Sequence, residues 1–205
     1  MICSKNERTL VIIKPDGVQR SLIGEIIQRF ERLGLKMVGI KMVVAKPDHI
    51  ETHYTIDPEW RVKTGEKTIK AYKDRGEKHP DGEDPLIITG IILNKLRSYM
   101  ASGPVIPMVL EGAHAVSIVR KIVGSTEPLS SDVGTIRGDF VLDSYEMSDT
   151  GGRSVRNVLH ASGSTEEAEK EIDLWFKKEE IIDYRHIQEG IIYDDLGHIL
   201  GNRVD

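Results

Sequence analysis

One histidine stands in a setting that suits nucleophilic chemistry. His160 lies in the segment NVLHAS, just before a capping pattern, Ser164 with Glu167 three places on, that predicts the start of a helix. Glu171 falls about three turns beyond His160, where its carboxylate could hold the imidazole in one tautomer. The plainer alternative is a partly buried histidine without a chemical role, the usual state of any one of the seven histidines.

Three cations stand at positions from which they could surround an anion. Lys14 ends an apolar run, Arg120 lies on a mostly apolar helix, and Arg137 sits in the segment GTIRGD. Singly each is an ordinary solvated cation, but together they suggest a phosphate site. The sequence has neither GxxxxGK[ST] nor GxGxxG after a strand, which disfavours P-loop NTPases, dinucleotide-binding dehydrogenases and protein kinases. Side chains would therefore have to bind the phosphates.

A second pair of histidines has the spacing of a zinc site. His49 and His53 are four residues apart, the separation at which one helix presents two ligands. The zincin pattern is HExxH, whereas the segment here reads HIETH, with the glutamate one place late. Because the sequence offers no evident third ligand, we expect two surface histidines and no metal site made by the protein.

Charge and cysteine content narrow the class of protein. The chain has 205 residues and a formal net charge of −5, which disfavours broad attraction to nucleic acid or to an anionic membrane. Cys3 is the only cysteine, so no disulfide can form within the chain. The segment MICSKNER turns charged too early for a signal peptide, and the longest apolar runs have the length of strands. We expect a cytoplasmic protein.

Hydrophobic spacing predicts strands and helices in the order β-α-β…β-α-β, a sheet with helices on one face. Strands are expected at TLVIIKPDG, at 35–44 and at GPVIPMVLEG. Helices are expected over 22–33 with Gly34 at the end, from 47 with Asp48 as cap and Glu51 three places on, over 85–100, over 114–124, and from Ser164 through Phe176. Residues 125–139 are expected to form a long loop.

Two segments interrupt this order. About half of residues 57–85 are charged, so we expect a solvated insertion, partly helical, that adds little to the core. A second insertion, at about 142–153, is polar and rich in glycine. The tail from about residue 184 has no clear period. We expect one domain that spans residues 1–205.

Several segments together resemble the nucleoside diphosphate kinase family. They are ERTLVIIKPDGVQRSLIGEIIQRFERLGLKMVGIKMV, SGPVIPMVLEG, GTIRGDF, RNVLHAS and EAEKEIDLWF, in that order. The resemblance covers most of the chain outside the insertions and the tail. It implies a ferredoxin-like α+β fold, a four-stranded antiparallel sheet with helices packed on it. It also implies ping-pong transfer of the γ-phosphate of a nucleoside triphosphate to a nucleoside diphosphate through a phosphohistidine.

The resemblance also assigns roles by position. His160 would be the nucleophile, and Glu171 would orient its ring. The other assignments are Lys14 to the γ-phosphate, Arg120, Thr126 and Arg137 to the distal phosphates, Asn157 to ribose and phosphate, Tyr54 beside the histidine, Ser162 as support, and Leu96 to the base. Mg²⁺ would be held mainly by the nucleotide phosphates. A homo-oligomer, either hexamer or tetramer, is implied.

The sequence departs from the family pattern in three places. Gly163 replaces the usual aspartate after NxxHxS, which predicts weaker order in the loop before the next helix. The first insertion replaces the region of the aromatic that stacks on the base, and Trp60 is a candidate substitute. The second insertion falls between Arg137 and His160 and, like the tail, could alter subunit contacts.

Two other functions remain open on the sequence alone. A nucleotide-binding regulatory protein that keeps the fold without turnover is motivated by Gly163 and by the altered base region. Labelling with γ-labelled ATP that chases onto GDP or CDP would favour the enzyme. Nucleic-acid binding is disfavoured, because the basic residues of the first insertion alternate with acidic ones. These basic residues are Lys63, Lys67, Lys70 and Lys73.

Overall fold

Four strands form one antiparallel sheet in the computed structural model, which describes residues 4–194 and 196. The strands are β1 (Arg8–Ile13), β2 (Lys36–Ile40), β3 (Ile106–Glu111) and β4 (Leu159–Ala161). Their order across the sheet is β2-β3-β1-β4, with β1 paired to both β3 and β4. This is the ferredoxin-like sheet that the sequence predicted.

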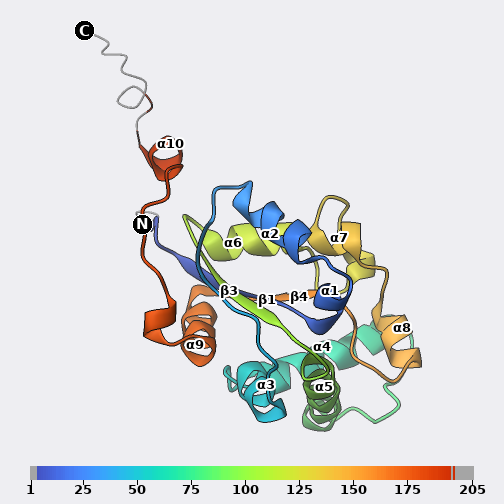
Figure 1. The fold of residues 1–205 in the computed structure, drawn as a ribbon. Coiled ribbons are helices and arrows are strands. Elements are labelled where there is room, and N and C mark those ends of the chain that lie inside the picture. The colour runs from blue at the N-terminus through green and yellow to red at the C-terminus, as the bar shows by residue number, and fades with distance from the viewer. Residues whose placement is uncertain (1–3, 195, 197–205) are drawn as a thin grey trace.

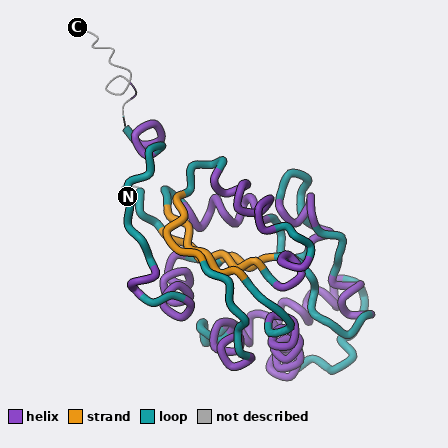
Figure 2. The backbone as a smooth tube through the Cα atoms, viewed as in Figure 1, coloured by secondary structure: helices purple, strands orange, loops and turns teal. Residues whose placement is uncertain are grey.

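Helices cover both faces of the sheet (Figures 1 and 2). Along β1, Leu10 and Ile12 face one apolar cluster, while Val11 and Ile13 face the other. All four side chains have no exposed surface. A strand buried on both sides reads as an unbroken apolar run, which LVII is. The prediction of helices on one face only was therefore wrong.

Each face of the sheet is covered by helices that are separated in the sequence. One face carries α2 (Ile23–Glu31) and α6 (Ala115–Val123), and the other carries α3 (Pro47–Tyr54), α5 (Pro85–Met100) and α9 (Thr165–Trp175). The remaining helices are α1 (Pro15–Gln19), α4 (Trp60–Asp74), α7 (Ile136–Phe140), α8 (Tyr145–Thr150) and α10 (Glu189–Tyr193), with short 3₁₀ turns at Pro128–Ser130 and Lys178–Glu180.

The first insertion is mostly the helix α4, docked on α5. Gly65 is buried, and a Cβ at that position would come within 2.2 Å of the Pro85 carbonyl oxygen. Thr89 of α5 donates a hydrogen bond to the Arg61 carbonyl of α4. The charged side chains point outward, the segment is partly helical, and it adds no large buried side chain to the core, as expected. The docking of α4 on α5 was not predicted. A single glycine allowed two backbones to approach closely, a feature that charge counting does not detect.

Two further local predictions, the cap at Asp48 and the uninterrupted loop at 125–139, were wrong because of where helix caps fall. The helix at 47 begins with Pro47, so Asp48 lies in its first turn and Lys46 is the cap. Within the predicted loop, Thr135 accepts from the Gly138 amide and starts α7. In the second insertion Ser144 likewise accepts from the Met147 amide and starts α8. Short capped helices have too few residues to show a period.

The tail folds back along the edge of the sheet. The Ile182 amide donates to the Val38 carbonyl of β2 at 2.8 Å, and the Tyr184 hydroxyl donates to the Met37 carbonyl. Beyond it, Lys36 binds Glu111 at 2.8 Å and Glu189 of α10 at 3.2 Å. The tail therefore has ordered contacts through α10, whereas its last residues and Cys3 lie outside the described residues.

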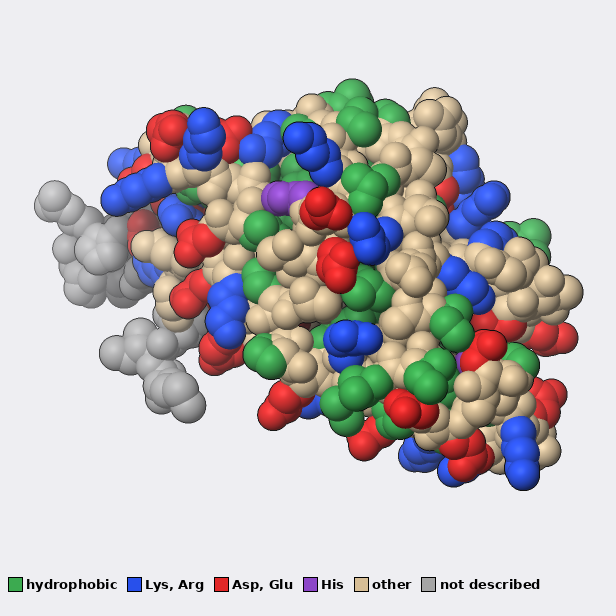
Figure 3. All heavy atoms as spheres, turned by 90° about the horizontal axis from the view of Figure 1, so that it is seen from below, with side chains coloured by type: hydrophobic (Ala, Val, Ile, Leu, Met, Phe, Trp, Pro, Cys, Tyr) green, Lys and Arg blue, Asp and Glu red, His purple; other side chains and the backbone are tan. Residues whose placement is uncertain are grey.

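The surface below the sheet shows no broad patch of one charge. Figure 3 views the face formed by the lower helices, where basic and acidic side chains alternate. The four lysines of α4 are exposed, as the sequence predicted. Across residues 4–194, no helix combines the length and the apolar character needed to cross a membrane.

Candidate active site

A cavity of about 550 Å³ lies between the sheet and the two insertions. It brings together side chains from segments that lie far apart in the chain, from Lys14 to Glu171. Of the residues that the sequence singled out, it is lined by Lys14, Tyr54, Trp60, Leu96, Arg120, Thr126, Arg137, Asn157, His160 and Glu171. Ser162 does not reach it and is fully buried behind Glu171.

His160 is placed by β4 and held from behind by α9. Its backbone pairs with Ile12 of the central strand β1. Its Nε2 atom lies 2.8 Å from Oε1 of Glu171, although the N–H direction falls outside that of a normal hydrogen bond. Ser162 donates to the other oxygen of Glu171 at 2.6 Å and accepts from the Leu10 amide. Ser162 thus fixes one oxygen of the carboxylate, and the other oxygen faces the His160 ring.

The electrostatic setting keeps the His160 ring neutral. Burial, followed by the positive charges of Lys14, Arg137 and Arg120, holds the pKa of His160 well below its ordinary value. Burial also raises the pKa of Glu171. A carboxylate oxygen facing Nε2 favours the proton on that nitrogen, which leaves the lone pair on Nδ1. No described residue hydrogen-bonds to Nδ1.

A strained residue precedes the histidine. Val158 has φ of 56°, a left-handed conformation that is rare for a β-branched side chain. Two hydrogen bonds hold it there: the Lys14 amide donates to the Val158 carbonyl, and the Val158 amide donates to Asp16. The start of β4 is therefore fixed to the end of β1, which brings Lys14 and His160 to the same cavity.

Lys14 enters the cavity from the end of β1, as the sequence predicted. It is 5% exposed, and its ammonium donates to Oδ1 of Asn157 at 2.7 Å. Burial, and then the charge of Arg137, lower the pKa of Lys14 to about 7. The Asn157 amide in turn donates to the Thr126 carbonyl at 2.8 Å. Little negative charge surrounds this ammonium, so a bound anion would stabilise its charged form.

Arg137 is built into the backbone around the site. It donates to the carbonyls of Asn157 and Leu159 on one side and of Gly124 and Ser125 on the other. These four bonds leave one of the five guanidinium N–H groups uncommitted among the described residues. Burial lowers the pKa of Arg137 to about 10, so it remains charged at neutral pH.

Arg120 is exposed at the cavity, and its guanidinium lies close to the Gly163 loop. Its Nη1 atom is 3.9 Å from the point where a Cβ on Gly163 would lie. The Gly163 amide donates to the Glu167 carboxylate at 2.8 Å, while Ser164 caps α9 by accepting from the Glu167 amide. Half of the predicted capping box is therefore confirmed. Glu167 supplies a carboxylate contact to the loop in which Gly163 replaces an aspartate.

His53 is a residue that the sequence placed wrongly. It is 2% exposed, and its ring centroid lies 4.4 Å from that of His160. The Trp175 indole donates to its Nδ1, and burial lowers the pKa of His53 to about 3. The spacing of His49 and His53 reflects one helix face that packs on Trp175, because His49 also contacts that ring at 4.4 Å. His53 is therefore not a surface histidine.

One group of described residues could hold a metal ion. Ligand atoms of His53, His160 and Glu171 lie within 4.8 Å of one another. Two imidazoles and one carboxylate suit zinc-like metals better than Mg²⁺, which prefers oxygen ligands.

An aromatic path leads away from the histidine. The Tyr54 ring lies 6.3 Å from the His160 ring and 5.7 Å from the Trp60 ring, measured between centroids. Burial raises the pKa of Tyr54, so its hydroxyl stays protonated. Leu96 of α5 faces the same cavity. The cavity thus has a cationic end at His160 and an apolar and aromatic middle.

A ferredoxin-like fold that presents a neutral imidazole among buried cations has the features of a phosphoryl-transfer enzyme. The family model described as nucleoside diphosphate kinase matches residues 7–62 and 90–181. A nucleoside diphosphate kinase of Pyrobaculum aerophilum is 48% identical over 180 residues, which are 86% of this chain and 98% of the relative. Nucleoside diphosphate kinase A of Mus musculus is 38% identical over 191 residues, 93% of this chain and 99% of the relative.

Solved structures agree with these sequence relatives. The crystal structure of the Pyrobaculum aerophilum enzyme superposes with a TM-score of 0.83 at 47% identity, covering 87% of this chain and 100% of that one. A Borrelia burgdorferi nucleoside diphosphate kinase, a transition-state mimic with bound vanadate and ADP, gives 0.73 at 37% identity, covering 90% and 95%. The chain belongs to the nucleoside diphosphate kinase family. It is a phosphotransferase that moves the γ-phosphate of a nucleoside triphosphate to a nucleoside diphosphate.

Proposed function

We propose that His160 carries the phosphoryl group between the two nucleotides. Its Nδ1 lone pair attacks the γ-phosphorus in line, the bond from phosphorus to the β,γ-bridging oxygen breaks, and the nucleoside diphosphate leaves. A second nucleoside diphosphate then attacks the phosphohistidine and restores the neutral ring. The observation that supports this most is the contact of Nε2 with the buried carboxylate of Glu171, which leaves Nδ1 for the chemistry.

The cations supply the charge stabilisation that this transfer needs. Lys14 is assigned to the γ-phosphate, where its amine gains a proton as the anion arrives. Arg120 is exposed to the cavity and is assigned with Arg137 to the distal phosphates. Phosphoryl transfer depends more on positioning and on cations around the equatorial oxygens than on covalent machinery.

The neighbouring side chains have supporting roles in this proposal. Glu171 orients the ring, and Ser162 fixes Glu171 through the 2.6 Å hydrogen bond. Asn157 is assigned to ribose and phosphate, and its hydrogen bond to the Lys14 ammonium, which is assigned to the γ-phosphate, supports this role. The other assignments are Thr126 at the distal phosphates, Tyr54 beside the histidine, and Leu96 at the base.

Mg²⁺ is proposed to arrive with the nucleotide. The phosphate end of the cavity presents cations, and the trio of His53, His160 and Glu171 is a poor match for a metal that prefers oxygen. The residues present therefore fit a magnesium ion held mainly by the phosphates, where it supplies neutralisation of charge. The relative solved with ADP and vanadate supports a cavity that takes a nucleoside diphosphate together with a transferring phosphoryl group.

The assembly is proposed to be a homo-oligomer, either hexamer or tetramer, in the cytoplasm. Apolar side chains stay exposed beside the outer strand β2, notably Ile40, Met42 and Val44. Light scattering during size-exclusion chromatography would measure the mass. We also propose that residues 1–205 form one domain, which the docking of α4 on α5 and of the tail on β2 supports.

Replacement of His160 tests the assignment of the nucleophile. His160→Gln is expected to abolish phosphate exchange between ATP and GDP. The matched control is His114→Asn, which changes an exposed histidine at φ of 56° to a residue that tolerates this conformation. Retention of exchange by His160→Gln would overturn the assignment.

A further inference from the structure

We propose that the two insertions form a bridged wall that encloses the nucleoside half of the substrate, with Tyr72 and Asp149 as the positioning residues that join the wall. This inference rests on the proposed function, because it takes the end of the cavity at His160 as the phosphate end. It concerns the opposite end, where the first insertion contributes α4 and the second contributes α8.

One face of α4 lines the cavity along most of its length. Trp60, Thr64, Thr68 and Tyr72 follow one another at intervals of four residues, and all four line the cavity. Residues four apart lie on the same side of a helix, so α4 presents a continuous row of side chains to the ligand. A helix that was only a solvated decoration would not present its inner face in this way.

Both walls are fixed to the body of the protein. The close contact of Gly65 with Pro85 holds α4 against α5. The segment of α8 is held at its base, where Arg153 binds Asp143 through two hydrogen bonds of 2.6 and 2.9 Å. The Tyr145 amide of α8 also donates to Glu127, outside the insertion, at 2.9 Å. Each insertion therefore has a contact with the body of the protein.

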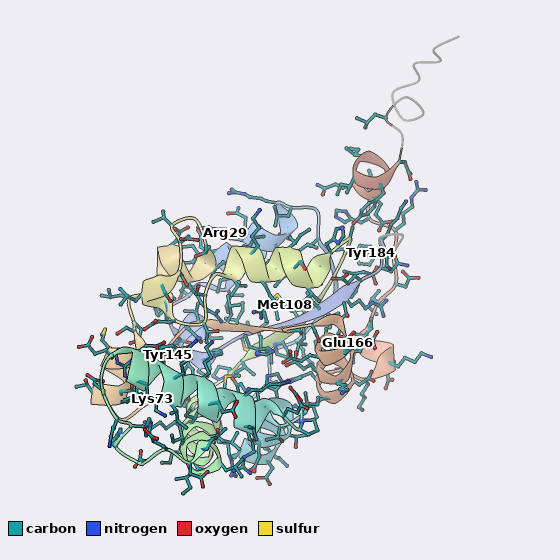
Figure 4. The ribbon with its side chains drawn as sticks, turned by 180° about the vertical axis from the view of Figure 1, so that it is seen from behind. Arg29, Lys73, Met108, Tyr145, Glu166 and Tyr184 are labelled. Carbon is teal, nitrogen blue, oxygen red and sulfur yellow. The ribbon has the colours of Figure 1, made fainter. Side chains whose placement is uncertain are left out.

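A hydrogen bond joins the two walls across the cavity. The Tyr72 hydroxyl donates to Oδ2 of Asp149 at 2.8 Å, a charge-assisted bond. The Tyr72 ring packs against His79, 4.6 Å between centroids, and the Arg75 guanidinium lies 4.3 Å from its centre. Figure 4 shows the end of α4 that carries Lys73 near Tyr145 of α8. These contacts hold the Tyr72 ring in place, so its hydroxyl is already positioned to donate to Asp149.

The chemistry of the enclosed space matches a nucleoside. Trp60, Ile91 and Ile92 line this part of the cavity with apolar and aromatic surface, and Lys67, Arg75 and Lys95 line it with charged side chains. Hydroxyl groups of Thr64 and Thr68 add polar contacts. A flat heteroaromatic base with an attached sugar fits such a mixture of apolar surface and few polar groups. In such an enclosed space the surrounding walls hold the base. The base then does not depend on stacking against one aromatic ring at an open surface.

The test separates nucleoside binding from chemistry. Tyr72→Phe, Asp149→Ala and the double variant are compared in the ATP to GDP reaction. Each single variant is expected to raise the KM for the nucleoside diphosphate about five-fold to ten-fold with kcat within about two-fold, which is the scale of one lost charge-assisted bond. The double variant is expected to match the singles, because one bridge is lost in all three.

A phosphate-only probe and a neighbouring variant serve as controls. Inhibition by inorganic tripolyphosphate is expected to stay unchanged, since it does not reach the bridged end. Lys73→Ala, which breaks the exposed ion pair with Glu83 outside the cavity, is expected to leave KM unchanged. All variants should still label on His160, so a failure of the proposed function would show separately. An unchanged KM, unequal or additive effects, a fall in kcat alone, or weaker tripolyphosphate inhibition would overturn the inference.

Discussion

Nε2 of His160 lies 2.8 Å from Oε1 of Glu171, and Ser162 donates to the other oxygen of the same carboxylate at 2.6 Å. The relationship decides which ring nitrogen can act. A carboxylate can only accept, so it favours the tautomer with the proton on Nε2 and the lone pair on Nδ1. The site thereby prepares the nucleophile before any nucleotide binds.

Replacing Glu171 by glutamine tests this control of the tautomer. The amide group can donate to Nε2, which would move the ring proton to Nδ1 and remove the lone pair from the cavity. Phosphorylation by ATP, measured by rapid quench, is expected to slow by roughly 100-fold or more. Glu169→Gln, on the exposed face of the same helix, is the control and should react at the normal rate. A normal rate for Glu171→Gln would contradict the role of the carboxylate.

Lys14 predicts a pH dependence of nucleotide binding. Its pKa of about 7 in the free cavity means that most of it is neutral at pH 8. A bound γ-phosphate favours the ammonium form, so binding of a non-hydrolysable ATP analogue should take up a proton, and its affinity should fall as pH rises above about 7. Calorimetry at pH 8 in two buffers of different protonation enthalpy measures the uptake. Lys14→Arg should abolish it, and a wild-type protein without uptake would refute the prediction.

Arg137 is expected to be needed for stability as well as for activity. Lysine cannot reproduce its four hydrogen bonds to carbonyls on both sides of the site. Arg137→Lys should therefore lower the free energy of unfolding by roughly 2–4 kcal/mol in urea denaturation, and should also slow phosphorylation at saturating ATP. If this variant is as stable as the wild type, the carbonyl contacts are not what holds the loop.

The buried ion pairs of Glu111 are expected to stabilise the fold at a place far from the active site. Its carboxylate, 4% exposed, binds Arg8 at 2.7 Å and Lys36 at 2.8 Å. Glu111→Gln removes one of the carboxylates that compensate the Lys36 ammonium, which keeps Glu189 at 3.2 Å, and should lower the free energy of unfolding by roughly 1.5–3 kcal/mol. The exposed pair of Lys63 with Glu59 is the comparison, and Lys63→Ala should leave the urea midpoint unchanged within the error of the measurement. Equal losses would show that burial is not the cause.

Much of the sheet could be predicted from the sequence because each central strand is a compact apolar run. The buried segment LVII and the strand at 106–111 do not show the spacing of apolar residues that predicts a helix. Lys14 directly follows the first of these two segments. The gathering of Lys14, Arg120, Arg137, Asn157 and His160 in one cavity was likewise expected from the resemblance. At these positions the hydrophobic pattern and the family resemblance led to the same prediction.

The errors arose where tertiary contact decides the structure. The charge content of residues 57–85 did not reveal that Gly65 allows α4 to dock on α5. His49 and His53 were expected at the surface because no third metal ligand was evident, but Trp175, more than a hundred residues later, packs on their helix face. No local window of sequence contains such a partner. The bridge from Tyr72 to Asp149 was missed for the same reason.

The most direct test of the central claim is to locate the phosphate on the enzyme after a single turnover. The protein is mixed with γ-labelled ATP and Mg²⁺, quenched under alkaline conditions, and mapped by peptide mass spectrometry. We predict one acid-labile phosphate per chain, on His160, that transfers to added GDP. Label on any other residue, or label on His160 that does not transfer to GDP, would contradict the account.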